Sequence, residues 1–369
     1  MNSPLQIREF LQQAQKCPVI DVRSPGEFDQ GHIPGAINIP LFDNEERAKV
    51  GTAYVQKSKE EAIRIGYEIA NPKIDLFLSK VEKIAAAEQA NKRTSEQAND
   101  EPLTINHKPL TVLIHCWRGG MRSSKFAQLL NENGYNTYTL VRGYKAYRNF
   151  VLQSFNRNAD ILVVGGETGS GKTEILKHIA AQGEQVIDLE ALANHKGSAF
   201  GSLGEAPQPT NEQFENALCA AFGKLDPARK IWLEDESRSI GKVQLPAALW
   251  ARMKEALILR VSVPKSSRIE RLVADYGNFS KEELSSCVLK IHQRLGGQHV
   301  NRALEELEKG DLHEVADITL TYYDKAYNYN HEKRSMKDVF FIECDSADAK
   351  LNAGKVLEYA NTKLKKNYA

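Results

Sequence analysis

Two segments of the chain each place a glycine-rich loop directly after an apolar run and directly before a helical stretch. The first is residues 115–123 (HCWRGGMRS), after the apolar run 111–114, and the second is residues 166–173 (GETGSGKT), after the apolar run 160–164. A loop between a strand and a helix of a parallel sheet presents backbone N–H groups and the positive end of the helix to an anion. The sequence therefore predicts two α/β units, each with its own anion site.

The length of the chain and the order of its segments favour two domains. A chain of 369 residues exceeds the size of one typical hydrophobic core. We expect an N-terminal α/β domain over residues 1–155 and a second, parallel-sheet α/β domain over residues 156–369, which reads mainly helical beyond residue 265. Residues 44–105 read as a helical and polar insertion in the first domain. Within it, residues 88–101 contain almost no large apolar side chain and are predicted to form an exposed loop.

Composition and charge exclude several classes of protein. The net charge is +1, and 41% hydrophobic with 26% charged residues is typical of an ordinary globular protein rather than a disordered one. No apolar run approaches the roughly 20 residues of a bilayer span, so we expect a cytoplasmic protein without membrane contact. The five cysteines are scattered without metal-type pairing, so we expect neither a disulfide framework nor a zinc or redox cofactor.

Cys116 is the predicted nucleophile of the first loop. Backbone N–H groups, the helix end and the side chains of Arg118 and Arg122 surround it with positive charge, which lowers the pKa of a thiol and favours the thiolate. The alternative is that Cys116 is a small core residue, because free cysteines are often buried. The other four cysteines lack this setting and are predicted to be structural.

The second loop matches the phosphate-binding pattern G-x-x-x-x-G-K-[ST] in the strand-to-helix setting that the pattern requires. Its predicted phosphate-binding residues are Gly166, Gly169, Ser170, Gly171, Lys172 and Thr173. Glycines let the backbone wrap an anion, the lysine adds a point charge, and the threonine hydroxyl binds Mg²⁺. Asp235, after another apolar run, is predicted to be the second magnesium-side residue, although acidic clusters after strands are also common as solvated loop starts. Glu234 is the next candidate and Asp188 a weaker one.

Basic and aromatic residues gather in the last third of the chain. Basic groups neutralise RNA phosphates and exposed aromatic rings stack on unpaired bases, so these residues are candidates for an RNA contact. A solvated helix surface with core tyrosines would explain the same residues. The residues concerned are Lys265, Arg268, Arg271, Lys290, Arg294, Arg302, Tyr322, Tyr323, Tyr327 and Tyr329.

Three further segments of the first domain carry a family resemblance. Residues 21–28 (DVRSPGEF), 31–36 (GHIPGA) and 141–146 (VRGYKA) resemble the recurring motifs of rhodanese domains, with Cys116 at the sulfur-carrying position of that family. The loop departs from the family in one respect, because five residues separate Cys116 from Arg122, which is the spacing of cysteine-dependent phosphatases. The longer loop makes room for a phosphate or a selenium atom.

A rhodanese-like domain followed by a P-loop domain resembles the tRNA 2-selenouridine synthase family over nearly the full length. Residues 51–54, 188–201, 234–238 and 322–324 resemble that family's own segments. The resemblance implies a transferase that replaces sulfur by selenium in the wobble 2-thiouridine of tRNA, with selenophosphate as selenium donor. It also implies S-geranylation of that sulfur by geranyl diphosphate, Mg²⁺ as cofactor, the anticodon region of tRNA as partner, and a selenophosphate-producing enzyme as a candidate partner.

These expectations combine into one mechanistic hypothesis. The P-loop, with Lys172 and Mg²⁺, would hold geranyl diphosphate while the thiouridine sulfur attacks the geranyl carbon. Cys116, with Arg118 and Arg122, would then carry or position selenium. Three alternatives remain open at this stage: a cysteine-dependent phosphatase, a P-loop kinase or ATPase with an accessory rhodanese-like module, and a thiosulfate sulfurtransferase with an attached domain.

Overall fold

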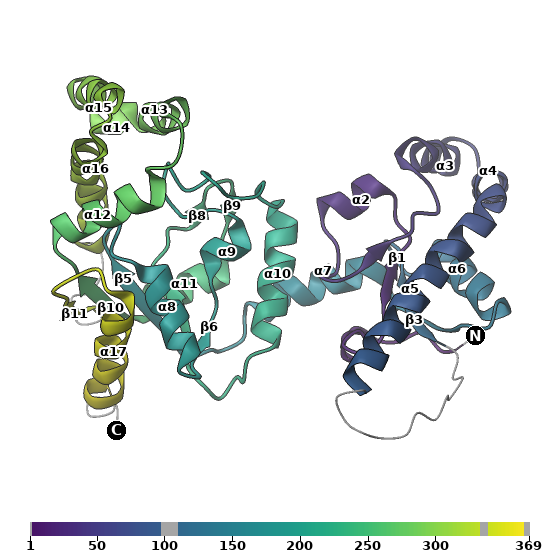
Figure 1. The fold of residues 1–369 in the computed structure, drawn as a ribbon. Helices are drawn as coiled ribbons and strands as arrows, with labels where there is room; N and C mark the ends of the chain where they lie inside the picture. Colours follow the sequence, from purple (N-terminus) through teal and green to yellow (C-terminus); the bar gives the residue numbers. More distant parts are fainter. Residues whose placement is uncertain (1, 97–109, 333–338, 365–369) are drawn as a thin grey trace. The chain divides into compact units, whose positions relative to one another are not determined.

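The computed structural model describes residues 2–96, 110–332 and 339–364. It divides into two compact units, Met1–Gln153 and Ser154–Ala369, which are described separately below (Figure 1). Within the described residues, no helix is both long and apolar enough to cross a membrane.

The described part of the first unit contains a four-stranded parallel sheet. The strands lie in the order β2 (Ile37–Asn38), β1 (Val19–Asp21), β3 (Thr111–His115) and β4 (Asn136–Thr139). All of β1 and the last four residues of β3 are buried, as expected where helices cover both faces of a parallel sheet. The α-helices are α1 (Ile7–Gln13), α2 (Pro25–Gln30), α3 (Asn44–Gln56), α4 (Lys59–Ala70), α5 (Ile74–Glu96), α6 (Met121–Glu132) and α7 (Gly143–Ser154), with the 3-10 turn η1 (Asn71–Lys73) before α5.

The insertion in this unit is helical and contributes to the core. Helices α3, α4 and α5 make it up, and the side chains of Phe77 and Val81 on α5 are buried in the same cluster as β1 and β3. The predicted exposed loop at 88–101 was wrong as far as Glu96, because α5 continues to that residue. Alanine, glutamate, glutamine, lysine and arginine favour helix without being large apolar residues, so the lack of large apolar side chains did not indicate a loop. Residues 97–101 lie outside the described residues.

The described part of the second unit contains a five-stranded parallel sheet and confirms the predicted α/β class. Its strands lie in the order β11 (Val339–Glu343), β10 (Leu257–Ser262), β5 (Ile161–Gly166), β7 (Ile231–Glu234) and β6 (Gln185–Val186). The region beyond residue 265 was expected to be mainly helical, but the apolar run Val339–Glu343 adds the edge strand β11.

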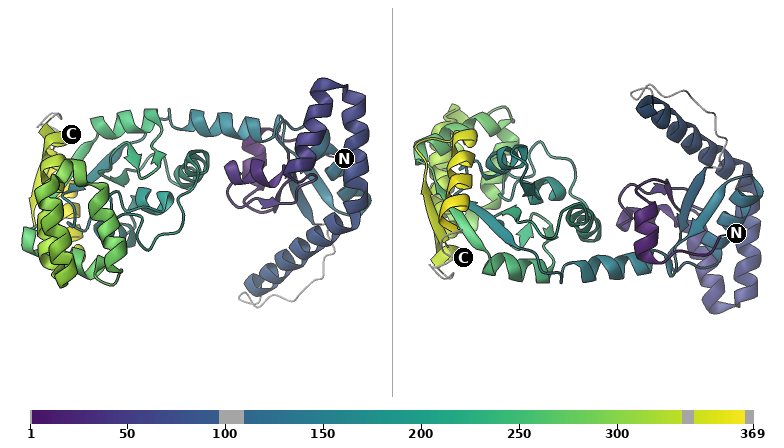
Figure 2. Two further views of the ribbon diagram at one scale, coloured as in Figure 1. Left: turned by 90° about the horizontal axis from the view of Figure 1, so that it is seen from above. Right: turned by 90° about the horizontal axis from the view of Figure 1, so that it is seen from below.

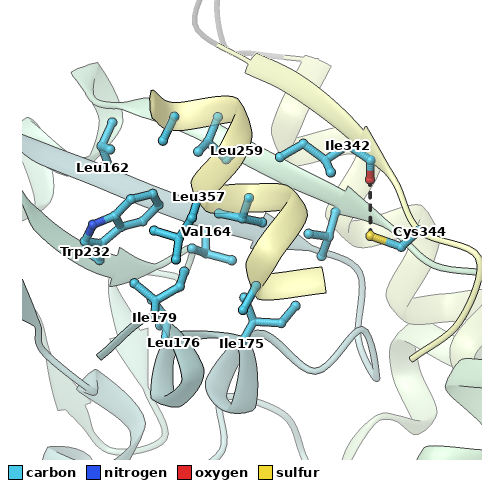
Figure 3. Close-up of a cluster of buried hydrophobic side chains, with 14 of the residues drawn as sticks. Leu162, Val164, Ile175, Leu176, Ile179, Trp232, Leu259, Ile342, Cys344 and Leu357 are labelled. Carbon is cyan, nitrogen blue, oxygen red and sulfur yellow. Dashed lines mark hydrogen bonds between the residues drawn. The ribbon is translucent and has the colours of Figure 1, made fainter. Parts of the chain in front are cut away.

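One face of this sheet is covered by α8 (Lys172–Ala181) and α17 (Ala349–Tyr359). Figure 3 shows side chains of β5, β7 and β10, among them Leu162, Val164 and Trp232, packed against these two helices. The central position of β5 places the loop that follows it between two neighbouring strands, β10 and β7. The remaining short elements before the helical part are α9 (Leu189–Ala193), α10 (Asn211–Gly223), β8 (Ser239–Ile240), β9 (Val243–Gln244) and α11 (Ala247–Glu255), and η3 (Ala360–Leu364) follows α17.

Five further helices form a helical part with its own core. They are α12 (Lys265–Tyr276), α13 (Lys281–Lys290), α14 (His292–Leu295), α15 (Gly297–Lys309) and α16 (Leu312–Glu332). The views in Figures 1 and 2 agree that these green helices stay together at the side of the unit where the edge strand β11 lies. Helix α12 follows β10 directly, so the helical part begins beside the loop that follows β5.

Candidate active site

The cysteine loop joins β3 to α6. Cys116 is 3% exposed, and its Sγ lies 3.2 Å from Ser123 Oγ. The Ser123 hydroxyl also donates a hydrogen bond to the carbonyl of Gly120 (3.1 Å). The Ser123 hydroxyl therefore stands directly beside the Cys116 sulfur; its single proton points to the Gly120 carbonyl and would have to turn to Sγ to stabilise a thiolate.

The segment after β4 supports the cysteine loop through its backbone. The carbonyl of Cys116 accepts a hydrogen bond from the N–H of Tyr144 (2.8 Å). Gly119 and Gly143 both have positive φ, +64° and +55°. A Cβ on Gly143 would lie only 2.2 Å from the Cys116 carbonyl oxygen, so only glycine fits between the two segments. The exposed Arg142 before it also has a positive φ, +59°.

The two predicted arginines of this loop have different surroundings. Arg118 is exposed, whereas Arg122 forms an ion pair with Glu27 (2.8 Å). Burial would raise the pKa of Glu27, but the hydrogen bond and charge of Arg122 outweigh it and hold the pKa below its usual value. Glu27 also accepts the N–H of Ser24 in the capping box of α2. The structure thus joins Arg122 to a carboxylate 95 residues earlier in the chain.

A buried polar cluster lies beneath the cysteine loop. The fully buried Arg23 donates to both carboxylate oxygens of Asp21, at distances between 2.6 and 3.0 Å. Its guanidinium carbon stands 3.7 Å from the ring centroid of Tyr144 and 5.9 Å from that of Trp117. Burial lowers the pKa of the neighbouring His115 to about 4, so this imidazole is neutral at physiological pH. Paired charges and stacked rings fix the base of the loop.

The phosphate loop has the backbone geometry that its sequence predicted. Gly169 and Gly171 have φ values of +82° and +80°. The Nζ of Lys172 donates to the carbonyl of Gly166 (3.2 Å), across the mouth of its own loop. Ser170 is buried, and its Oγ has no hydrogen-bond partner among the described residues. The loop therefore presents donors toward an anion.

A tyrosine from the far end of the chain holds the start of this loop. The N–H of Gly166 donates to the hydroxyl oxygen of Tyr327 on α16 (2.7 Å), and that hydroxyl donates to Oδ2 of Asp235 (3.1 Å). Burial and the Asp235 charge raise the pKa of Tyr327 well above its usual value. Tyr327 therefore remains a neutral hydroxyl that links the loop, the end of β7 and the helical part.

Three carboxylates gather beside Thr173, the second residue of α8. One oxygen from each of Glu190, Glu234 and Glu236 lies within 4.8 Å of the others. Thr173 Oγ1 donates to Glu190 (2.8 Å) and lies 3.4 Å from an oxygen of Glu234. Burial and the neighbouring carboxylates raise the pKa of all three acids, that of Glu236 to about 8. Three crowded carboxylates and a hydroxyl are hard oxygen ligands and suit Mg²⁺.

The position of Asp235 follows from the alternation of side chains along an extended segment. Glu234 and Glu236 point to one side, beside Thr173, whereas Asp235 between them points to Tyr327. The geometry therefore favours Glu234 and Glu236 over Asp235 as metal-side residues. Asp188, the weaker candidate, caps α9 by accepting the N–H of Ala191 (2.8 Å). Sequence reasoning missed Glu190 and Glu236, although the period of two along 234–236 was a usable signal.

A cavity of about 1200 Å³ extends from the phosphate loop into the helical part. Lys172, Thr173, Glu190 and Glu236 line it, and the helical part adds both charged and apolar side chains. Its apolar lining residues include Leu272, Val273, Leu284, Ile291, Leu312, Val315 and Ala316. His195, which is 9% exposed, also lines the cavity, and its Nδ1 has no partner among the described residues. The cavity can therefore hold a phosphorylated molecule with an apolar part.

Three of the candidate RNA-contacting residues contact the phosphate loop or the helix that follows it. Arg268 is 3% exposed, pairs with Asp324 through two hydrogen bonds (2.8 and 2.9 Å) and donates to the carbonyl of Thr168 (3.1 Å). Arg271 lines the cavity and pairs with Glu174 on α8. Tyr327 has the bridging role described above. These contacts make the helical part a wall of the phosphate site.

Comparisons with known proteins agree with the two loops. The family model of the tRNA 2-selenouridine synthase AAA domain matches residues 159–358, and that of the rhodanese-like domain matches residues 6–150. A tRNA 2-selenouridine synthase from Bdellovibrio bacteriovorus is 32% identical over 91% of this chain and 94% of its own length. One from Shewanella denitrificans is 32% identical over 88% of this chain and 91% of its own length. One from Nitrosomonas eutropha is 38% identical over 70% of this chain and 63% of its own length.

Proposed function

This chain belongs to the tRNA 2-selenouridine synthase family, and from that membership we propose that selenophosphate is its selenium donor and that the exchange passes through an S-geranylated base. It is a tRNA-modifying enzyme. Its substrate is then a 2-thiouridine at the wobble position of the anticodon, and the reaction belongs in the cytoplasm, where tRNA functions. The two loops divide the chemistry between a diphosphate step and a selenium step.

The phosphate loop serves the first step. Its backbone N–H groups and Lys172 bind the diphosphate of geranyl diphosphate, and apolar residues among those that line the cavity pack against the geranyl chain. Thr173, Glu190, Glu234 and Glu236 would hold Mg²⁺, which would stabilise the charge of the leaving diphosphate. The sulfur of 2-thiouridine attacks the geranyl carbon; the C–S bond forms, the C–O bond to the diphosphate breaks, and the base loses its N3 proton.

The cysteine loop serves the second step. Selenophosphate is a tetrahedral anion that suits the loop N–H groups and the exposed Arg118. The Cys116 thiolate attacks phosphorus, so that an S–P bond forms, the P–Se bond breaks and hydroselenide is released; water later removes the phosphoryl group. Hydroselenide then attacks C2 of the S-geranylated base, where the C–Se bond forms and geranylthiol leaves with a proton. The phosphatase-like spacing of the loop and the Ser123 hydroxyl 3.2 Å from the sulfur support this assignment.

One observation carries the proposal for the first step. The hydroxyl of Thr173 lies 2.8 Å from Glu190 in a 1200 Å³ cavity that several apolar side chains of the helical part also line. An isoprenoid diphosphate needs oxygen ligands and cations for its diphosphate and apolar contacts for its chain, and this cavity supplies both.

Nucleoside mass spectrometry tests the division of labour. 2-Thiouridine-containing tRNA is incubated with protein, Mg²⁺ and selenophosphate, with and without geranyl diphosphate. The Cys116→Ser variant should accumulate the geranylated nucleoside without forming 2-selenouridine. The Lys172→Ala variant should impair geranylation before it impairs the selenium step. Cys17→Ser and Lys224→Ala, which change the same residue types away from both loops, are the matched controls and should behave as wild type.

Three outcomes would contradict the proposal. Equal loss of both products in both variants would remove the division between the loops. Nucleotide hydrolysis that survives Cys116→Ser, with unchanged tRNA, would favour the kinase alternative. Cys116-dependent release of phosphate from a generic aryl phosphate, or of thiocyanate from thiosulfate and cyanide, again with unchanged tRNA, would favour a phosphatase or a sulfurtransferase.

A further inference from the structure

A second, smaller pocket lies in the helical part beside the main cavity. Its volume is about 320 Å³, within the range of a small-ligand site. We call it the side pocket; it is formed by α14, α15 and α16. Its lining residues are Arg294, Leu295, His299, Thr321, Tyr322, Lys325, Ala326 and Tyr329. The mechanism proposed above uses none of them.

The ionisable side chains of one sign, the basic ones, dominate the lining of the side pocket. Three basic side chains, Arg294, His299 and Lys325, line it, and its described lining contains no carboxylate. The chain as a whole has 49 Lys and Arg against 48 Asp and Glu. A pocket lined by three basic residues and no acidic one therefore differs from the average of the chain. Within the described residues, neither His299 nor Lys325 forms an ion pair. The pocket therefore offers positive charge to an anion.

The aromatic side chains of the pocket are placed for stacking. Tyr329 is 59% exposed at its rim, which is a large exposure for an aromatic ring. The Tyr322 hydroxyl accepts a hydrogen bond from Arg294 (3.2 Å), which orients both side chains. Exposed rings beside phosphate-binding cations are the combination that binds single-stranded nucleic acid.

The side pocket and the main cavity share a wall. Arg294, Tyr322 and Ala326 line both, so a strand in the side pocket is adjacent to the cavity that ends at the phosphate loop. RNA bases that undergo chemistry leave the stack and insert into a pocket, while their neighbours stay outside. The two adjacent pockets match a target base in the main cavity and one neighbouring nucleotide in the side pocket.

We propose that the side pocket binds one nucleotide of the tRNA anticodon loop adjacent to the target base, with its base stacked on Tyr329 and its phosphate on Lys325 and Arg294. This inference rests on the proposed function, because it assumes that the target base enters the main cavity. It assigns part of the tRNA contact to the P-loop unit rather than to the cysteine loop.

Binding of an anticodon stem-loop RNA to the full-length protein tests the inference. Fluorescence anisotropy at several salt concentrations gives the affinity and its salt dependence. Loss of one stacking contact in Tyr329→Ala should weaken binding about tenfold, whereas Tyr329→Phe keeps the ring and should bind as wild type. Lys325→Ala should weaken binding and reduce the slope of log affinity against log salt by about 1. Lys309→Ala removes an exposed cation of α15 that pairs with Glu306 outside the pocket, and should leave binding unchanged.

The outcomes separate this inference from the proposed function. Wild-type protein that neither binds nor modifies the RNA would overturn the proposed function and the inference with it. Wild-type modification, with Tyr329→Ala and Lys325→Ala both binding like Lys309→Ala, would overturn the side pocket alone. An effect of Lys325→Ala without one of Tyr329→Ala would overturn it too, because a phosphate contact alone is no nucleotide site. Single-turnover rates at saturating RNA should remain unchanged in Tyr329→Ala, as expected for a binding residue.

Discussion

Replacing Gly143 by alanine should separate the two chemical steps. The new Cβ would lie 2.2 Å from the Cys116 carbonyl oxygen and 2.5 Å from the backbone nitrogen of Gly119, both of them backbone atoms that cannot rotate away. Ordinary contacts begin near 3.4 Å, so the cysteine loop must move by roughly 1.2 Å. The phosphate loop belongs to the other unit and keeps its structure.

The size of the effect follows from that displacement. A misplacement of about 1 Å at a reacting group costs on the order of 100-fold in rate, so selenium transfer should fall by about that factor. The positive φ of +55° adds a strain cost of about 1–2 kcal/mol for any residue with a Cβ. Gly134→Ala is the matched control, because Gly134 has a φ of +84° in the same unit and nothing within 4 Å of the new Cβ.

Mass spectrometry of tRNA nucleosides and thermal unfolding provide the readout. Gly134→Ala should lower Tm by several degrees, since each kcal/mol is worth about 2–4 °C in a unit of this size, and should still selenate tRNA. Gly143→Ala should accumulate the geranylated nucleoside while 2-selenouridine nearly disappears. The reasoning is refuted if Gly143→Ala forms 2-selenouridine as fast as Gly134→Ala does.

Two further predictions concern the phosphate loop. The raised pKa values of Glu234 and Glu236, the latter to about 8, mean that the folded protein binds more protons than the unfolded chain, so without metal its stability falls as pH rises from about 4.5 through 8. Mg²⁺ replaces those protons, so scanning fluorimetry should show a larger gain in Tm with Mg²⁺ near pH 8.5 than near pH 6, and Glu236→Gln should reduce the difference; an equal gain at both pH values would count against the metal site. Tyr327→Phe leaves the Gly166 N–H without its partner, which costs about 1–3 kcal/mol. Its Tm should fall and geranylation should slow, whereas a variant identical to wild type in both would refute the bridging role.

The strand–loop–helix junctions were predictable because each depends on neighbouring residues. Glycines with positive φ, an apolar strand before them and a helix after them all lie within about a dozen positions of the chain, so the pattern at 166–173 already described the loop. The α/β class followed in the same way from the alternation of apolar runs and helical segments. Both conclusions required no information about long-range contacts.

The partners of the predicted residues were not predictable, because they come from distant segments. Glu27 reaches Arg122 from 95 residues away, and Glu190 reaches Thr173 from a different strand–helix connection. Glu236 was accessible in principle, since it shares a face with Glu234 in extended backbone. The sequence reasoning placed Asp235 first and Glu234 close behind, whereas in the structure Glu234 faces Thr173 and Asp235 faces Tyr327.

The Tyr327 bridge also sets an order of events during synthesis of the protein. The phosphate loop leaves the ribosome early, but the hydroxyl that binds its Gly166 N–H lies 161 residues further along the chain. Until that segment emerges, the loop after β5 lacks this contact, although the neighbouring strand β10 is made earlier. Because chains lengthen by only about 5–20 residues per second, the nascent loop spends roughly 8–32 seconds without this support. The phosphate site therefore acquires its full support only once nearly the whole second unit has been made.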